Sequence, residues 1–161
     1  MALSDFMKTK VSEWLREEGF FYEEIVDPDT RFNFSTKVAG LAFDIIQDIS
    51  RDVVVVRSTL IFNDEQMAMI HNMSPKRRDD FLWDIRFMLL GNNEISGFRI
   101  KPNLEHMEVL IQSRGIFQDA FTKDRLLHSI LTVHKAVTMV IWMLQRASGG
   151  HESVVDSNLY M

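Results

Sequence analysis

The chain has 161 residues, of which 25% are charged and 46% are hydrophobic, and its formal net charge is -5 at pH 7. This length fits one domain that can bury a sizeable core without covalent cross-links. The sequence contains no cysteine, which excludes disulfides, thiolate metal sites and cysteine nucleophiles. The negative net charge argues against broad electrostatic attraction to nucleic acid or to anionic lipid.

The sequence carries no signal for export or membrane insertion. It has no uninterrupted apolar run of the roughly 20 residues that a membrane span needs. The N-terminal stretch MALSDFMKTK lacks the apolar segment and the small-residue cleavage site of a signal peptide. We therefore expect a cytoplasmic protein without membrane or nucleic-acid partners.

The N-terminal segment predicts a helix followed by an extended stretch. In LSDFMKTKVSEWLREEG the apolar residues recur at helical spacing, and Gly19 suits the position after a helix end. The stretch FFYEEIV, residues 20–26, is interpreted as extended, and the DPDT that follows it is typical of a turn.

Three strands are predicted next. RFNFSTKV (31–38) alternates apolar with polar residues, LAFDIIQ (41–47) alternates over its first half, and VVVVRSTLIF (53–62) begins with four β-branched residues. The connections between these strands are too short for parallel crossovers. An antiparallel meander is therefore favoured.

Two helices and two further strands follow. Asn63 or Asp64 is expected to cap a short helix in EQMAMIHNM. Ser74 is expected to cap a second helix, which begins at Pro75 and which GNN ends after Leu90. The stretches ISGFRIK and EHMEVLIQS predict two strands joined by a turn.

A long helix and a tail complete the chain. Thr122 is expected to cap a helix that continues to about Arg146. We take residues 1–147 as a single α+β domain. Residues 148–161 open with Ser-Gly-Gly and show no strong period, so we expect a flexible C-terminal tail there.

The order of these elements defines the fold class. Helices and strands follow one another as αβββαββα, and strands and helices are segregated along the chain. This pattern predicts an α+β fold in which an antiparallel five-stranded sheet carries the helices packed on it.

The helix predicted for residues 75–90 has two apolar stripes. At 100° per residue, one stripe is formed by Phe81, Leu82, Ile85, Met88 and Leu89. A second stripe, on roughly the opposite side, is formed by Trp83, Phe87 and Leu90. One stripe can cover the sheet, whereas the second needs a separate partner, because a surface helix normally shows one apolar face.

The last helix repeats this pattern. Its wide core stripe is formed by Leu126, Leu127, Ile130, Leu131, Val133, Val137, Val140, Ile141 and Leu144. Met139, Trp142 and Met143 extend the apolar surface around the back, near the C-terminal end. Either these residues form a surface for a partner, or the helices bury them against one another in a thick core.

A basic cluster lies at the start of the helix at 75–90. Lys76, Arg77 and Arg78 fall in its first turn, after Ser74. Free backbone N–H groups and arginine side chains at such a place could hold a phosphate. The simpler interpretation is a solvated helix start, in which aspartates neutralise the charge, for example Asp80 beside Lys76. We favour the helix start and keep an anion or nucleotide site as the alternative.

The sequence gives no catalytic motif. None of its five histidines forms HExxH or another tight spacing of metal ligands, and no Gly-rich phosphate loop or GxSxG elbow is present. His134 falls within the apolar stripe of the last helix, which favours a buried, hydrogen-bonded side chain. We expect no catalytic residues, no cofactor and no metal. An enzyme that uses His134 or His106 with a carboxylate is the weakest alternative.

Four stretches, which span most of the chain up to about residue 146, carry a resemblance. They are VSEWLREEGF, DVVVVRSTLIFNDEQ, SPKRRDDFLWDIRFMLL and GIFQDAFTKDRLLHSILTVHKAV. Together with the order αβββαββα, they resemble an uncharacterised, mainly archaeal family with the fold of type III secretion chaperones and YbjN-like domains. Chaperones of that fold dimerise and wrap extended segments of client proteins. The resemblance therefore implies a homodimer or a peptide-binding surface, and no catalytic residues.

The function predicted is that of a non-catalytic protein-interaction or chaperone-like domain, which dimerises or binds an amphipathic segment of a partner protein. The candidate partner-binding residues are Trp83, Phe87, Leu90, Met139, Trp142 and Met143. The candidate residues of the alternative anion or nucleotide site are Ser74, Lys76, Arg77 and Arg78. We expect a homodimer, with a protein or peptide client as a further partner.

Overall fold

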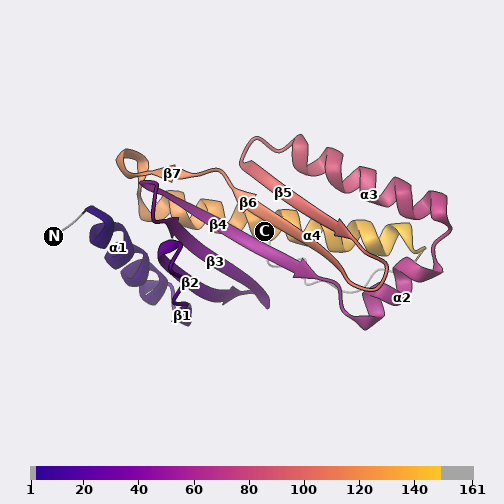
Figure 1. Cartoon of the computed structure of the whole chain (residues 1–161), viewed down its shortest axis with the longest axis horizontal. Coiled ribbons are helices and arrows are strands. Elements are labelled where there is room, and N and C mark those ends of the chain that lie inside the picture. The colour runs from indigo at the N-terminus through magenta and orange to yellow at the C-terminus, as the bar shows by residue number, and fades with distance from the viewer. Residues whose placement is uncertain (1–2, 150–161) are drawn as a thin grey trace.

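Seven strands form one antiparallel sheet in the order β1-β2-β3-β4-β6-β5, with the short β7 paired to β4 (Figure 1). The computed structural model describes residues 3–149. The strands are β1 (Tyr22–Glu24), β2 (Thr30–Val38), β3 (Leu41–Asp48), β4 (Val53–Ile61), β5 (Ile95–Pro102), β6 (Met107–Ser113) and β7 (Ile116–Phe117). The helices are α1 (Leu3–Glu17), α2 (Asp64–Asn72), α3 (Pro75–Leu90), α4 (Lys123–Ala147) and the 3-10 helix η1 (Gln118–Ala120).

The predicted α+β class with an antiparallel sheet is confirmed, but the predicted number of five strands is wrong. The two additional strands are β1, with three residues, and β7, with two. Both are too short to show a period of their own. Each becomes a strand because it pairs with a longer neighbour, β2 and β4 respectively. The order αβββαββα also omits the break between α2 and α3.

The helices begin where the sequence predicts. Asn63 and Gln66 form a reciprocal capping box at α2. The Ser74 hydroxyl accepts a hydrogen bond from the Arg77 backbone N–H at 3.3 Å, ahead of Pro75 in the first turn of α3. In each case a polar side chain satisfies a backbone donor that has no partner within the helix.

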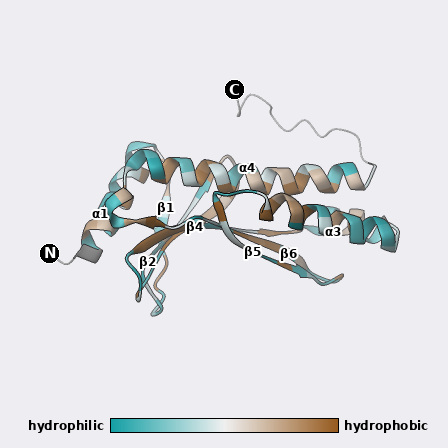
Figure 2. Cartoon of the chain, turned by 90° about the horizontal axis from the view of Figure 1, so that it is seen from above, coloured by the Kyte–Doolittle hydropathy of each residue, from teal (hydrophilic) through white to brown (hydrophobic). Residues whose placement is uncertain are grey.

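Helices α3 and α4 lie on the same side of the sheet (Figure 2). α4 packs behind β4 and β6, and α3 lies beside α4 and next to the edge strand β5. β6 shows the effect of covering the sheet on one side, because its residues alternate between buried and partly exposed along the strand. Met107, Val109 and Ile111 turn into the core, whereas Leu110 and Gln112 lie on the face that carries no helix among the described residues.

α1 closes the end of the layered core. Its apolar face buries Met7, Val11 and Leu15. Trp14 packs against Phe121, with ring centroids 5.0 Å apart. Burial of these side chains stabilises the attachment of α1 far more than the exposed ion pairs at its end, which typically contribute less than about 1 kcal/mol each.

α4 is the central helix of the core. By length and composition it is apolar enough to cross a membrane, with a mean hydropathy of 1.4 over its most apolar window. Half of that window is buried inside the protein, as is usual for a core helix, so this property is weak evidence for a membrane span. The helix ends at Ala147, and Gly149, which follows the C-cap Ser148, has a φ of 71°, a left-handed conformation that suits glycine. Of the predicted tail, residues 150–161 lie outside the described residues.

Candidate functional site

α3 buries one of its two apolar stripes and exposes the other, as the sequence predicts. Phe81, Ile85 and Leu89 are buried in the core. The opposite side exposes 49% of Trp83, 66% of Phe87 and 76% of Leu90. We call these last three residues the α3 ridge. Their exposure means that the second stripe has no cover within the described part of the subunit.

The α3 ridge is built from side chains that contact one another. The rings of Trp83 and Phe87 lie 5.8 Å apart between centroids, at the i, i+4 spacing that brings side chains together on a helix. The guanidinium carbon of Arg86 lies 4.8 Å from the centre of the Trp83 ring. Such cation–π contact contributes roughly 0.5–1 kcal/mol at an exposed site. The aromatic surface is therefore held in place before any partner arrives.

α4 has an exposed stripe of its own, which we call the α4 outer stripe. It consists of Leu131, Met139 and Trp142. The assignment of Leu131 to the core stripe is wrong, because it lies on the same face as the exposed Lys135. Met143 is half-buried and packs against the core. The candidate surface on α4 therefore keeps Met139 and Trp142, loses Met143 and gains Leu131.

The two exposed stripes have borders of opposite charge. Beside the Arg86 guanidinium that covers Trp83, the α3 ridge is bordered mainly by acidic side chains, the exposed Asp79, Asp80 and Asp84. The α4 outer stripe is bordered by the exposed Lys135 and Arg146. None of the three aspartates and two basic residues at these borders takes part in an ion pair within residues 3–149. Their charges are therefore available to a partner.

The basic cluster at the start of α3 contributes hydrogen bonds that join α3 to the end of α2. Arg78 donates to the backbone carbonyls of Ile70 at 3.4 Å and Met73 at 3.3 Å, which lie at the end of α2. Ser74 accepts from the Arg77 N–H, while the Lys76 side chain is exposed. Arg78 thus satisfies helix-end carbonyls. This arrangement supports the interpretation of the cluster as a helix start.

His134 and His106, the two histidines considered for a catalytic site, lie in different surroundings. His134 is buried on α4 and stacks on Phe43, with ring centroids 6.0 Å apart. His106 lies at the exposed tip between β5 and β6, where its Nε2 is 3.4 Å from Glu108. The salt bridge from Lys101 lowers the pKa of Glu108, which opposes use of this carboxylate as a proton acceptor near neutral pH. Within the described residues, no group of three or more His, Asp or Glu side chains could hold a metal ion.

Burial of His134 predicts a loss of stability in acid. Desolvation lowers the pKa of His134 below its ordinary value of 6.5. As the pH falls below this value, the unfolded chain binds a proton that the folded protein resists, so the free energy of unfolding decreases. His134→Gln, which cannot titrate, should reduce this decrease between about pH 7 and pH 5. Urea unfolding at a series of pH values measures it, and an unchanged profile in the variant would contradict the assignment.

Comparison with known proteins places this geometry in a family. Residues 7–144 match the family described as Uncharacterized conserved protein (DUF2299). A crystal structure of an uncharacterized protein from Methanothermobacter thermautotrophicus has a TM-score of 0.78 and 29% identity, over 87% of this chain and 97% of that chain. The crystal structure of YbjN from E. coli has a TM-score of 0.49 and 10% identity, over 85% and 88% of the two chains, and carries no argument about function. No curated protein matches. The predicted resemblance to an uncharacterised family is confirmed.

Proposed function

We propose that this chain, which belongs to the family of uncharacterized conserved proteins DUF2299, is a non-catalytic protein-interaction domain that docks through the α3 ridge. The observation that carries the proposal is the exposure of Trp83, Phe87 and Leu90 side by side on one helix. Contiguous apolar surface of this kind on a soluble domain is typical of an interaction site. Tryptophan is also among the residues that contribute most to binding when an interface buries them.

The partner that fits the charges is a second copy of the chain. In a two-fold dimer the same surface is used by both protomers, so the α3 ridge of one can lie on the α4 outer stripe of the other, twice. Asp80 and Asp84 beside one stripe would then face Lys135 and Arg146 beside the other. α3 and α4 pack against each other on the same side of the sheet, and the proposed dimer requires both stripes to face the partner. An amphipathic helix of another protein is the second candidate partner.

A charge-exchange experiment tests the proposed dimer. In the variant Asp80→Lys/Asp84→Lys, lysines lie beside the α3 ridge as well as basic residues beside the α4 outer stripe. In Lys135→Glu/Arg146→Glu, acidic residues lie beside both stripes. We expect each variant alone to be a monomer of about 18.8 kDa by light scattering, under conditions in which the native protein has twice this mass. An equimolar mixture should restore the doubled mass, because opposite borders meet again.

The outcomes separate the two candidate partners. A native protein that stays monomeric at every concentration tested would remove the dimer and leave the amphipathic helix as the partner. Native dimers with no recovery in the mixture would show that another surface makes the contact. All four substituted side chains are exposed, so circular dichroism should report an unchanged fold.

A further inference from the structure

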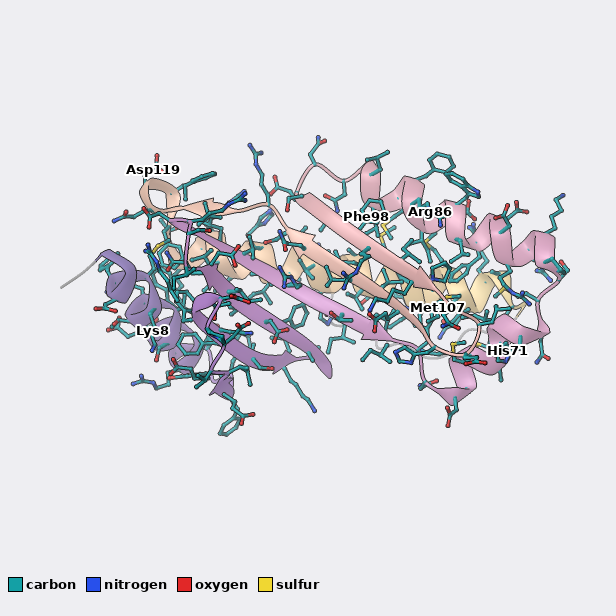
Figure 3. The ribbon with its side chains drawn as sticks, viewed as in Figure 1. Lys8, His71, Arg86, Phe98, Met107 and Asp119 are labelled. Atoms are coloured by element: carbon teal, nitrogen blue, oxygen red, sulfur yellow. The ribbon has the colours of Figure 1, made fainter. Side chains whose placement is uncertain are left out.

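The sheet face opposite α3 and α4 has a hollow with two arginines at its rim. Figure 3 views this face, with β4, β5 and β6 in front of α4. The hollow has a volume of about 280 Å³. It is lined by Arg57, Gly97, Phe98, Arg99, Leu110 and Gln112. It lies apart from the docking surface proposed above, because that surface is on helices α3 and α4 and the hollow is on the opposite face of the sheet.

Gly97 creates the hollow. In the sheet it lies opposite Gln112, which in turn lies opposite Arg57, so the three positions form one row across β5, β6 and β4. A Cβ atom added at Gly97 would meet no atom within 4 Å. Space is therefore not the reason for glycine here. Its missing side chain leaves the row open next to two long polar side chains.

Arg57 is fixed in this row. Its Nε and Nη2 atoms both donate to Oε1 of Gln112, at 3.2 and 2.8 Å. This fork holds the guanidinium plane on the sheet and leaves Nη1 and the Gln112 amide N–H groups as donors. A half-buried arginine whose orientation is already set loses little conformational entropy when it binds an anion.

Arg99 supplies the second charge. It lies opposite Leu110, one row along from Gly97 on the same face, and it is exposed. Arg57 and Arg99 are separated by two inter-strand spacings and by two residues along the strands, or roughly 12 Å between backbones, a distance that two arginine side chains can close. No ion pair within residues 3–149 involves Arg99.

Nearby carboxylates offset this charge only in part. Asp44 lies opposite Arg57; burial raises its pKa, and hydrogen bonding to Ser35 and the charge of Arg57 work in the other direction. Glu108 is engaged by Lys101 at 2.9 Å. The hollow thus concentrates positive charge in a chain whose formal net charge is -5.

We propose that this hollow binds the phosphate group of a small phosphorylated molecule. Arg57 Nη1, the Arg99 guanidinium and the Gln112 amide would donate to the phosphate oxygens, and Leu110 would contact an apolar part of the same molecule. Two guanidinium groups match the two negative charges of a phosphate monoester and its several acceptor oxygens. The site would therefore favour a dianion over a carboxylate.

Titration with inorganic phosphate, followed by ¹⁵N NMR, tests the site. We expect saturable shifts of the backbone amides of Gly97 and Gln112, at least tenfold weaker binding in Arg57→Gln and in Arg99→Gln, and weaker binding of acetate. Arg77→Gln tests the alternative anion site at the start of α3, and we expect it to bind phosphate as the native protein does.

Three results would overturn the proposal: the absence of saturable shifts, native phosphate affinity in Arg99→Gln, or acetate binding as tight as phosphate binding. Loss of binding in Arg77→Gln alone would move the anion site to the start of α3. Because Arg99 is exposed, its variant remains informative if Arg57→Gln fails to fold.

Discussion

Replacing Trp83 and Phe87 together with glutamate should turn the proposed dimer into a monomer of about 18.8 kDa. Both side chains are exposed in the single subunit, and docking would bury them. Loss of a buried aromatic anchor typically costs about 2 kcal/mol or more, and glutamate adds the cost of burying a charge. Two such losses weaken association by about 1,000-fold or more, since every 1.4 kcal/mol is tenfold. Light scattering over a dilution series measures the change.

Phe117→Glu is the control for this double substitution. Phe117 on β7 is 61% exposed, close to the 66% of Phe87, but it lies beside β4 and away from α3. The same aromatic-to-acid change there should leave the mass at its native value. If Phe117→Glu also produced monomers, added charge and not loss of the α3 ridge would explain the result. A double variant that kept the native mass would contradict docking through the ridge.

The helices could be predicted from the sequence because their signals are local. Ser74 and Pro75 fix the start of α3, and the spacing of Phe81 and Phe87 assigns them to opposite sides of the helix. Leu131 shows where this method fails. Its hydrophobicity suggested the core, whereas the row that continues through Lys135 and Arg146 marks the solvent side of α4. The charged residues were the better guide to that face.

The order of the strands could not be predicted from local patterns. A meander leads one to expect β5 next to β4, but the chain passes through α2 and α3 and returns so that β6 takes that place. This order brings Arg57, Gly97 and Gln112 into one row. A single glycine inside a predicted strand, such as Gly97, indicates by itself only an irregularity of that strand. The candidate anion site therefore depends on pairings between distant segments, which no spacing along the chain reveals.

Phe81→Ala and Phe87→Ala should have opposite consequences, although they make the same change on one helix. Phe81 is 1% exposed and part of the core, so its truncation leaves a cavity and should lower the free energy of unfolding by about 3–5 kcal/mol. Phe87 is exposed, and its truncation should change the stability of the single subunit by no more than about 0.5 kcal/mol. Association should weaken in Phe87→Ala and stay close to native in Phe81→Ala, because only Phe87 belongs to the α3 ridge.

Urea unfolding of both variants in the Trp83→Glu background, at low protein concentration, separates stability from association. Dimerisation would otherwise stabilise the folded state by mass action and conceal the difference. Equal losses of stability from the two truncations would mean that α3 buries both stripes within one subunit. In that case no apolar surface would remain for a partner, and the interaction proposal would lose its physical basis. A large loss for Phe81→Ala alone would leave Phe87 without a structural role in the single subunit, which supports a role in binding.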